Sequence, residues 1–198
     1  METDCHGISV GEHAGAEGQA ALSATLPFFR YHPDPVASGS IREAAEICVC
    51  CQRDRGWIYT ATFYTDREVG GRFCPWCIAD GSAAERFAGE FADSVGLDGV
   101  SEDVLHEVTH RTPGFRAWQD PHWLVHCQTA AAFKGEVGYA QLAARPDALA
   151  RLRTEMRLHG WRDEVRLEQF LIHLGESATA MLFRCTVCGT HLAYVDAS

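Results

Sequence analysis

Lysine, long apolar runs and net positive charge are what this chain of 198 residues has least of. Lys134 is the one lysine among 17 basic residues, and 27 acidic residues bring the net charge to −10 with histidine counted neutral. Nucleic-acid binding depends on clustered Lys and Arg side chains that contact phosphates. The charge balance therefore argues against nucleic acid and favours a basic protein partner, or no charged partner.

The sequence also has no segment with the features of a membrane span or of a secretory signal. Its unbroken apolar runs are only a few residues long, whereas a transmembrane helix needs about 20. Residues 1–25 contain four acidic side chains, no Lys or Arg, and no apolar stretch. We expect a cytoplasmic protein with no membrane partner, whose Gly-, Ala- and Ser-rich residues 1–25 form a disordered tail.

The rest of the chain is expected to fold as one α+β domain, residues 26–198, because strand and helix patterns occur without βαβ alternation. Enrichment in aromatic and β-branched residues, or alternation of apolar and polar residues, predicts strands over 57–64, 69–73, 123–127, 179–184 and 191–195. Apolar spacing and capping residues predict helices over 82–93, with a Ser82/Glu85 capping box, and over 101–110, 146–160 and 162–174.

Nine cysteines are the most informative feature of the composition. Because a reducing compartment disfavours disulfides, we interpret their spacing as metal-ligand or redox spacing. Three pairs have the Cys-x-x-Cys spacing: Cys48/Cys51, Cys74/Cys77 and Cys185/Cys188.

The first two pairs predict a structural zinc site. Cys-x-x-Cys in a tight turn directs two sulfurs to one ion, and two such knuckles place four sulfurs tetrahedrally at about 2.3 Å from zinc. We expect a ribbon over about 46–80, with a hairpin from Trp57 to Phe73 between the knuckles. Cys50 offers a third thiol beside the first pair, but the spacing favours Cys48 and Cys51.

The third pair predicts a closing knuckle over about 179–196 and needs two more ligands to hold a second zinc. The sequence offers four candidates: Cys127, His126, His122 and His191. We expect Cys127 with either His126 or His191. The alternative is that this pair completes no metal site.

Two kinds of chemistry compete with a structural role. Cys74-Pro-Trp-Cys77 superficially resembles a glutaredoxin motif, but such a motif should begin a helix, and the nearest predicted helix begins only at Ser82. The second site could instead be a catalytic zinc with an open position, His122 or His126 nearby and Glu136 as the base. No spacing in the sequence demands either.

The acidic charge is concentrated in residues 80–107, which hold eight acidic residues against Arg86 alone. One interpretation is a pair of solvated helix faces. The other is a docking surface for a cationic partner, centred on Glu85, Glu90 and Asp93.

Several longer stretches resemble the CbrC family, bacterial proteins of roughly this length with three Cys-x-x-Cys motifs. The matching words are Leu26-Pro-Phe-Phe-Arg-Tyr-His-Pro-Asp-Pro-Val36, Cys74-Pro-Trp-Cys-Ile-Ala-Asp-Gly-Ser-Ala83, Arg111-Thr-Pro-Gly-Phe115, Trp118-Gln119, Trp123-Leu-Val-His-Cys127 and Phe183-Arg-Cys-Thr-Val-Cys-Gly-Thr-His-Leu-Ala-Tyr194. The resemblance covers residues 26–196 and implies a link to colicin E2 tolerance.

The sequence therefore predicts zinc-ribbon-like hairpins with Cys-x-x-Cys knuckles, packed against several short helices. We expect a non-catalytic, zinc-binding interaction module with a toxin-tolerance or immunity-like role and a basic partner such as a toxin. A zinc-dependent hydrolase or a thiol–disulfide protein is the alternative.

Overall fold

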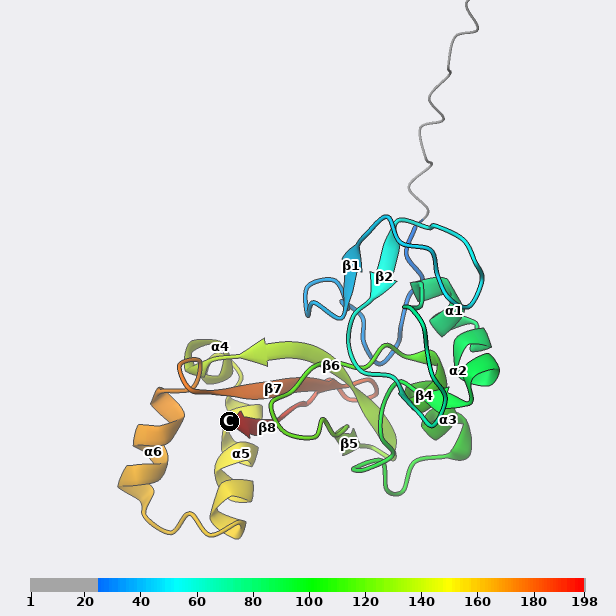
Figure 1. The fold of residues 1–198 in the computed structure, drawn as a ribbon. Helices are drawn as coiled ribbons and strands as arrows, with labels where there is room; N and C mark the ends of the chain where they lie inside the picture. The colour runs from blue at the N-terminus through cyan, green and yellow to red at the C-terminus, as the bar shows by residue number, and fades with distance from the viewer. Residues whose placement is uncertain (1–24, 198) are drawn as a thin grey trace, which may run out of the picture.

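The computed structural model describes residues 25–197 and combines helices with antiparallel sheet, as the sequence predicts (Figure 1). The predicted tail, apart from residue 25, lies outside the described residues. The helices are α1 (Pro75–Ala79), α2 (Ser82–Phe87), α3 (Glu102–Arg111), α4 (Tyr139–Ala143), α5 (Pro146–Leu158) and α6 (Glu164–Ile172). The strands are β1 (Ile41–Glu43), β2 (Trp57–Tyr59), β3 (Tyr64–Thr65), β4 (Gly89–Glu90), β5 (Val125–His126), β6 (Thr129–Val137), β7 (Ala178–Cys185) and β8 (His191–Ala197).

The largest sheet is antiparallel, in the order β5-β6-β7-β8. The register of β6 against β7 shifts between Phe133 and Gly135, so that Lys134 between them has no cross-strand partner. Such a bulge re-aims the extra side chain. Helices α4, α5 and α6 lie at one end of this sheet, and α1, α2 and α3 lie with the two small sheets at the other (Figure 1).

Three apolar clusters form the core. One packs aromatic residues, among them Phe133 and Phe183, on one face of the large sheet. A second packs α5 and α6 through leucines such as Leu152 and Leu167. The third surrounds the small sheets and contains the buried Cys48. No helix among residues 25–197 is long and apolar enough to cross a membrane.

The helices with clear start signals form where the sequence places them. Ser101 caps α3 by accepting a hydrogen bond from the Val104 amide at 3.3 Å. Pro146 occupies the first turn of α5, and Asp163 caps α6 by accepting from the amides of Val165 and Arg166.

The predicted capping box and the length of its helix are wrong. Gly81 occupies the N-cap of α2, and the Ser82 hydroxyl donates to Asp80 at 2.6 Å. The helix ends at Phe87 because Ala88 is left-handed, with φ of 48°, and the next residues form β4.

The predicted hairpin between the first two knuckles does not form as a continuous pair. Tyr59 donates one backbone hydrogen bond to Phe73 at 2.8 Å, but residues 69–73 form no strand. Strand β2 pairs with β1, and β3 pairs with β4. The partners lie outside the ribbon segment, and no local periodicity in the sequence indicates them.

The large sheet also has a strand that the sequence analysis missed. Strand β6 carries three consecutive alanines, Ala130 to Ala132, whose propensity for strands is low. Burial between neighbouring strands outweighs that preference, since all three side chains are buried. The predicted strand over 123–127 narrows to β5, because Cys127 enters the turn.

The position of Gly114, which follows α3, accepts only glycine without a shift of the backbone, because another backbone segment lies very close to it. A Cβ built there would collide with the backbone carbonyl of Phe91 and approach the Tyr59 Oη to 2.9 Å. The close contact at Gly114 holds the loop after α3, which leads toward the large sheet, against the apolar cluster that surrounds the two small sheets.

We expect Gly114→Ala to lower the free energy of unfolding by about 1–3 kcal/mol, because backbone has to move to admit the methyl group. Gly70→Ala is the matched control, since a Cβ there meets nothing within 4 Å. Urea unfolding followed by circular dichroism measures both variants. Equal stability of the two would contradict the proposed clash.

His32 ties the amino-terminal segment to the core and is 1% exposed. Its Nδ1 lies 2.7 Å from the Pro113 carbonyl, which only accepts, so Nδ1 carries the proton and Nε2 accepts from the Ser38 hydroxyl at 2.7 Å. Burial lowers the pKa of His32 to about 4, despite the hydrogen bond to Pro113.

Between pH 6.5 and about pH 4, His32 is therefore mostly protonated in the unfolded chain and mostly neutral in the folded chain. The contribution of His32 to the free energy of unfolding is complete above pH 6.5 and decreases as the pH falls below that value. Between pH 8 and pH 5 this decrease amounts to about 2 kcal/mol. His32→Gln removes that component. Urea unfolding of both proteins at the two pH values should show a smaller pH dependence for the variant, and an identical dependence would refute the assignment.

Candidate metal centres

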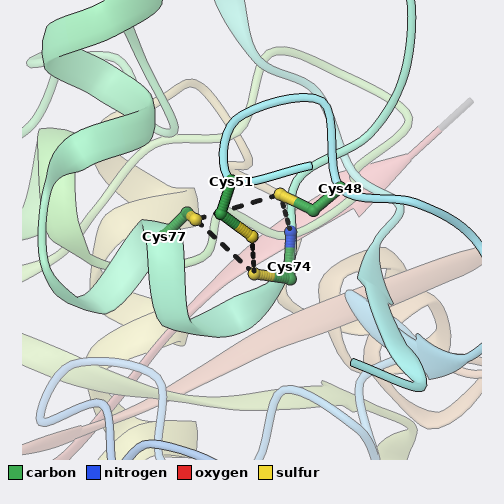
Figure 2. A group of neighbouring side chains, drawn as sticks. All are labelled: Cys48, Cys51, Cys74 and Cys77. Carbon is green, nitrogen blue, oxygen red and sulfur yellow. Dashed lines mark hydrogen bonds between the residues drawn. The ribbon is translucent and has the colours of Figure 1, made fainter. Parts of the chain in front are cut away.

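The first cluster consists of the sulfurs of Cys48, Cys51, Cys74 and Cys77, which lie within 4.8 Å of one another (Figure 2). The Sγ–Sγ distances are 3.9 Å from Cys48 to Cys77, 3.8 Å from Cys51 to Cys74 and 3.6 Å from Cys74 to Cys77. Four sulfurs bound at 2.3 Å to one tetrahedral ion lie about 3.8 Å apart. The cluster therefore has the dimensions of a four-thiolate metal site.

The first knuckle of this cluster is a tight backbone turn. Ile47 and Asp54 form an isolated bridge, and Cys48 donates its amide to Arg53 at 3.0 Å. Gln52 closes the turn with a left-handed φ of 57° and donates its own amide to the Cys48 carbonyl at 2.9 Å. The Arg86 guanidinium reaches across from α2 and donates to the Cys50 carbonyl.

The second knuckle begins α1. Cys74 occupies the N-cap and Pro75 the first turn, which brings Cys77 back beside Cys74. The Cys74 amide donates to the Cys48 sulfur at 3.2 Å, so that the two knuckles are already joined by backbone. A helix does begin here, contrary to the expectation that none starts before Ser82, but it is only five residues long.

The thiols of the first cluster compete for protons. The Cys48 sulfur accepts a hydrogen bond from the Cys74 side chain and others from backbone amides, which together hold the pKa of Cys48 at about 4 against its burial. That bond and burial raise the pKa of Cys74, and burial raises the pKa of Cys77. These directions favour a single thiolate at Cys48, and a divalent ion would supply the positive charge that stabilises further thiolates.

Cys50, the spare thiol of the first knuckle, lies outside the cluster. Its side chain is 5% exposed, and its sulfur lies 3.6 Å from the Ser82 hydroxyl. The spacing argument for Cys48 and Cys51 agrees with this placement.

The second cluster consists of His126, Cys127, Cys185 and Cys188, whose ligand atoms also lie within 4.8 Å of one another. His126 Nδ1 lies 3.2 Å from the Cys127 sulfur and 3.3 Å from the Cys188 sulfur, so Nδ1 is the candidate ligand atom. Cys185 is buried, whereas Cys127 and Cys188 are exposed. Three sulfurs and one imidazole nitrogen form a donor set known from structural zinc sites.

Two hairpin turns at the same end of the large sheet build the second cluster. Cys127 and Gln128 connect β5 to β6 with φ of 51° and 56°, a turn in which Asn and Gly are the favoured residues. After β7, the Cys185 sulfur accepts hydrogen bonds from the amides of Val187 at 3.4 Å and Cys188 at 3.5 Å. The two turns meet because Ala131 pairs with Cys185.

Of the remaining candidates, neither His191 nor His122 joins the second cluster. The backbone amide and Nδ1 of His191 face Asp147 Oδ2 at 2.7 Å and 3.2 Å. The His122 ring stacks on Tyr194, with centroids 3.8 Å apart. Glu136, considered as a base, lies about 17 Å further along β6 than Ala131, at about 3.4 Å per residue.

The three acidic residues considered for partner binding lie on neighbouring elements: Glu85 on α2, Glu90 on β4, and Asp93 in the following loop. Glu85 and Asp93 are exposed, and Glu90 is half-buried with its carboxylate 3.9 Å from His110 Nε2. The Asp93 carboxylate accepts the Val95 amide at 2.9 Å and keeps its exposed position. We call these three residues the acidic surface.

Both clusters lie within the part of the chain that a protein-family model matches. The model of the family described as "Uncharacterised protein family (UPF0167)" matches residues 26–197. UPF0167 proteins of Mycobacterium bovis and Mycobacterium tuberculosis are each 50% identical to the chain over 175 residues, which covers 86% of this chain and 93% of the relative. A UPF0167 protein of Pseudomonas aeruginosa is 48% identical over 124 residues, covering 61% of this chain and 69% of the relative. No solved structure matches the chain.

We expect Cys51→Ser and Cys77→Ser each to lose one equivalent of bound metal and to unfold the amino-terminal half, because structural zinc contributes about 10–16 kcal/mol of binding free energy. Cys50→Ser is the matched control and should keep full metal content. Elemental analysis and thermal unfolding measure both effects. Soluble, cooperatively folded Cys51 and Cys77 variants with unchanged metal would contradict the site.

Proposed function

The chain belongs to the UPF0167 family, and we propose that it is a zinc-stabilised, non-catalytic protein-interaction module acting in the cytoplasm. The two clusters hold together residues 48–77 and the end of the large sheet, and the acidic surface docks a basic protein partner. The resemblance to the CbrC family supports a role in tolerance of a protein toxin such as colicin E2.

The choice of zinc rests on the donor atoms. Thiolate-rich sites select zinc, copper(I) or iron–sulfur clusters, and tetrahedral sets of three or four sulfurs are typical of structural zinc. The imidazole nitrogen of His126 in the second cluster fits the same preference. Calcium and magnesium prefer oxygen ligands, and neither cluster offers any.

The observation that carries the non-catalytic assignment is the number of protein donors. A catalytic zinc keeps an open position beside three protein ligands, whereas each cluster here brings four donors together. A disulfide-exchange role needs an accessible thiolate, but Cys74 is 0% exposed and Cys77 is 4% exposed. Hydrolysis at the second cluster would need a base within hydrogen-bond reach, and Glu136 lies too far along β6.

The partner assignment rests on uncompensated charge. Arg86, the single basic residue in the 80–107 segment, donates to the Cys50 carbonyl and so is turned toward the first knuckle. No ion pair with Lys or Arg forms at Glu85, Glu90 or Asp93 among the described residues. Exposed like charges of this kind accelerate the association of an oppositely charged protein.

We expect the triple variant Glu85→Lys, Glu90→Lys and Asp93→Lys to bind the nuclease domain of colicin E2 at least about tenfold more weakly, mainly through a slower association rate at low salt. Surface plasmon resonance at two salt concentrations measures this effect. The matched control reverses three other exposed acidic residues, Glu43, Asp120 and Glu176, and so carries the same net charge.

Equal weakening in both triple variants would assign the effect to net charge and overturn the acidic surface as the docking site. Wild-type protein that fails to bind the nuclease domain would overturn the toxin partner. Zinc content is measured on the same samples and tests the proposed zinc sites independently of partner binding.

A further inference from the structure

A hollow beside the second cluster has the opposite charge to the rest of the molecule. Its lining includes Arg30, Lys134 and Arg184, together with the turn over 185–189, and contains no Asp or Glu. None of these three cations forms an ion pair with another residue of the described range 25–197. We call this lining, with Phe28, the basic hollow.

Three separate segments deliver the three cations. Lys134 is the unpaired residue of the β6 bulge. Arg184 stands opposite Ala132 on β7, and its Nε lies 3.4 Å from the Gly189 carbonyl. Arg30 lies on the extended amino-terminal segment, which joins β6 where the Phe133 amide donates to the Tyr31 carbonyl at 2.8 Å.

The turn of the second cluster is shaped around Arg184. Gly189 has a left-handed φ of 78°, and a Cβ there would lie 3.2 Å from an Arg184 guanidinium nitrogen. The knuckle thus leaves space for the guanidinium at the wall of the basic hollow. The single lysine of a chain with net charge −10 lies at the same place.

The three cations repel one another, and apart from the cluster cysteines Cys185 and Cys188 the lining has no acidic side chain to offset them, so a bound anion relieves that repulsion. A long polyanion would also meet the acidic remainder of the surface, which disfavours nucleic acid. A small anion contacts only the hollow. Guanidinium and ammonium groups together match phosphate oxygens, through forked and single hydrogen bonds respectively.

The rim of the hollow adds an apolar element. Phe28 is 78% exposed, and Val187, which also lines the hollow, is 65% exposed. An exposed aromatic ring beside cations offers a stacking surface for a planar group, as in proteins that bind nucleotide bases.

We propose that the basic hollow binds a phosphorylated small molecule of nucleotide size, with its phosphates on Lys134, Arg184 and Arg30 and its planar group on Phe28. The site goes beyond the proposed interaction role. The four side chains proposed to contact the ligand lie outside both metal clusters, although Cys185 and Cys188 line the hollow, so its test does not depend on the identity of the partner or the metal.

Titration calorimetry of the full-length, metal-loaded protein with ADP and with pyrophosphate, at low salt and without added divalent metal, tests the proposal. Both probes should bind, ADP more tightly. Lys134→Gln should weaken both by about tenfold, since it removes one charge-assisted hydrogen bond to the phosphates. Lys134 is exposed and has no cross-strand partner in the bulge, so this variant should fold normally.

Arg162→Gln is the matched control, because Arg162 is exposed in the α5–α6 loop and forms no ion pair within residues 25–197. Its affinity should equal that of the wild type. Phe28→Ala should remove the advantage of ADP over pyrophosphate. Failure of both probes to bind at millimolar concentration, or equal binding by the Lys134 and Arg162 variants, would overturn the site, and unchanged ADP preference in Phe28→Ala would overturn the stacking role.

Discussion

The convergence of sulfur atoms from separate turns is the constraint on which the amino-terminal half of this fold depends. Its strands, β1 to β4, are two or three residues long and form two isolated pairs. A two-stranded pair is marginal in water without further support. That support comes from an aromatic cluster that includes Phe73 and Phe91 and closes around the buried cysteines. A metal at the first cluster would fasten two loops that the hydrogen bonds of the sheets do not join.

The sequence predicted ligands better than it predicted strands. Cys-x-x-Cys spacing is a local property of a turn, so the three pairs could be recognised directly, and start signals such as Ser101 and Pro146 indicated helix starts for the same reason. The pairing of β2 with β1 and the burial of alanines in β6 depend on distant neighbours. The sequence could not decide between His126 and His191 as a ligand for a similar reason. The register of β6 on β7, which depends on distant residues, brings His126 to the Cys185/Cys188 pair.

The two clusters stand in different surroundings, and the difference suits different tasks. The first is enclosed by the core and anchored by Arg86. The second lies at the exposed end of the large sheet, where Cys127 and Cys188 face solvent and the basic hollow begins. The knuckle of the second cluster is stiffened by backbone, since the Cys185 sulfur accepts hydrogen bonds from the amides of Val187 and Cys188.

The brevity of β5 has a consequence if the second cluster holds a metal ion that is then removed. Two residues, Val125 and His126, pair with β6 there, and the connecting turn holds two non-glycine residues in left-handed backbone at about 1–2 kcal/mol each. Once chelation frees His126 and Cys127, little retains that short strand, and the amides of β6 become available to a neighbouring molecule. Exposed edge strands with unpaired backbone groups promote self-association. If a metal occupies the second cluster, we therefore expect chelator-treated protein to self-associate as well as to unfold.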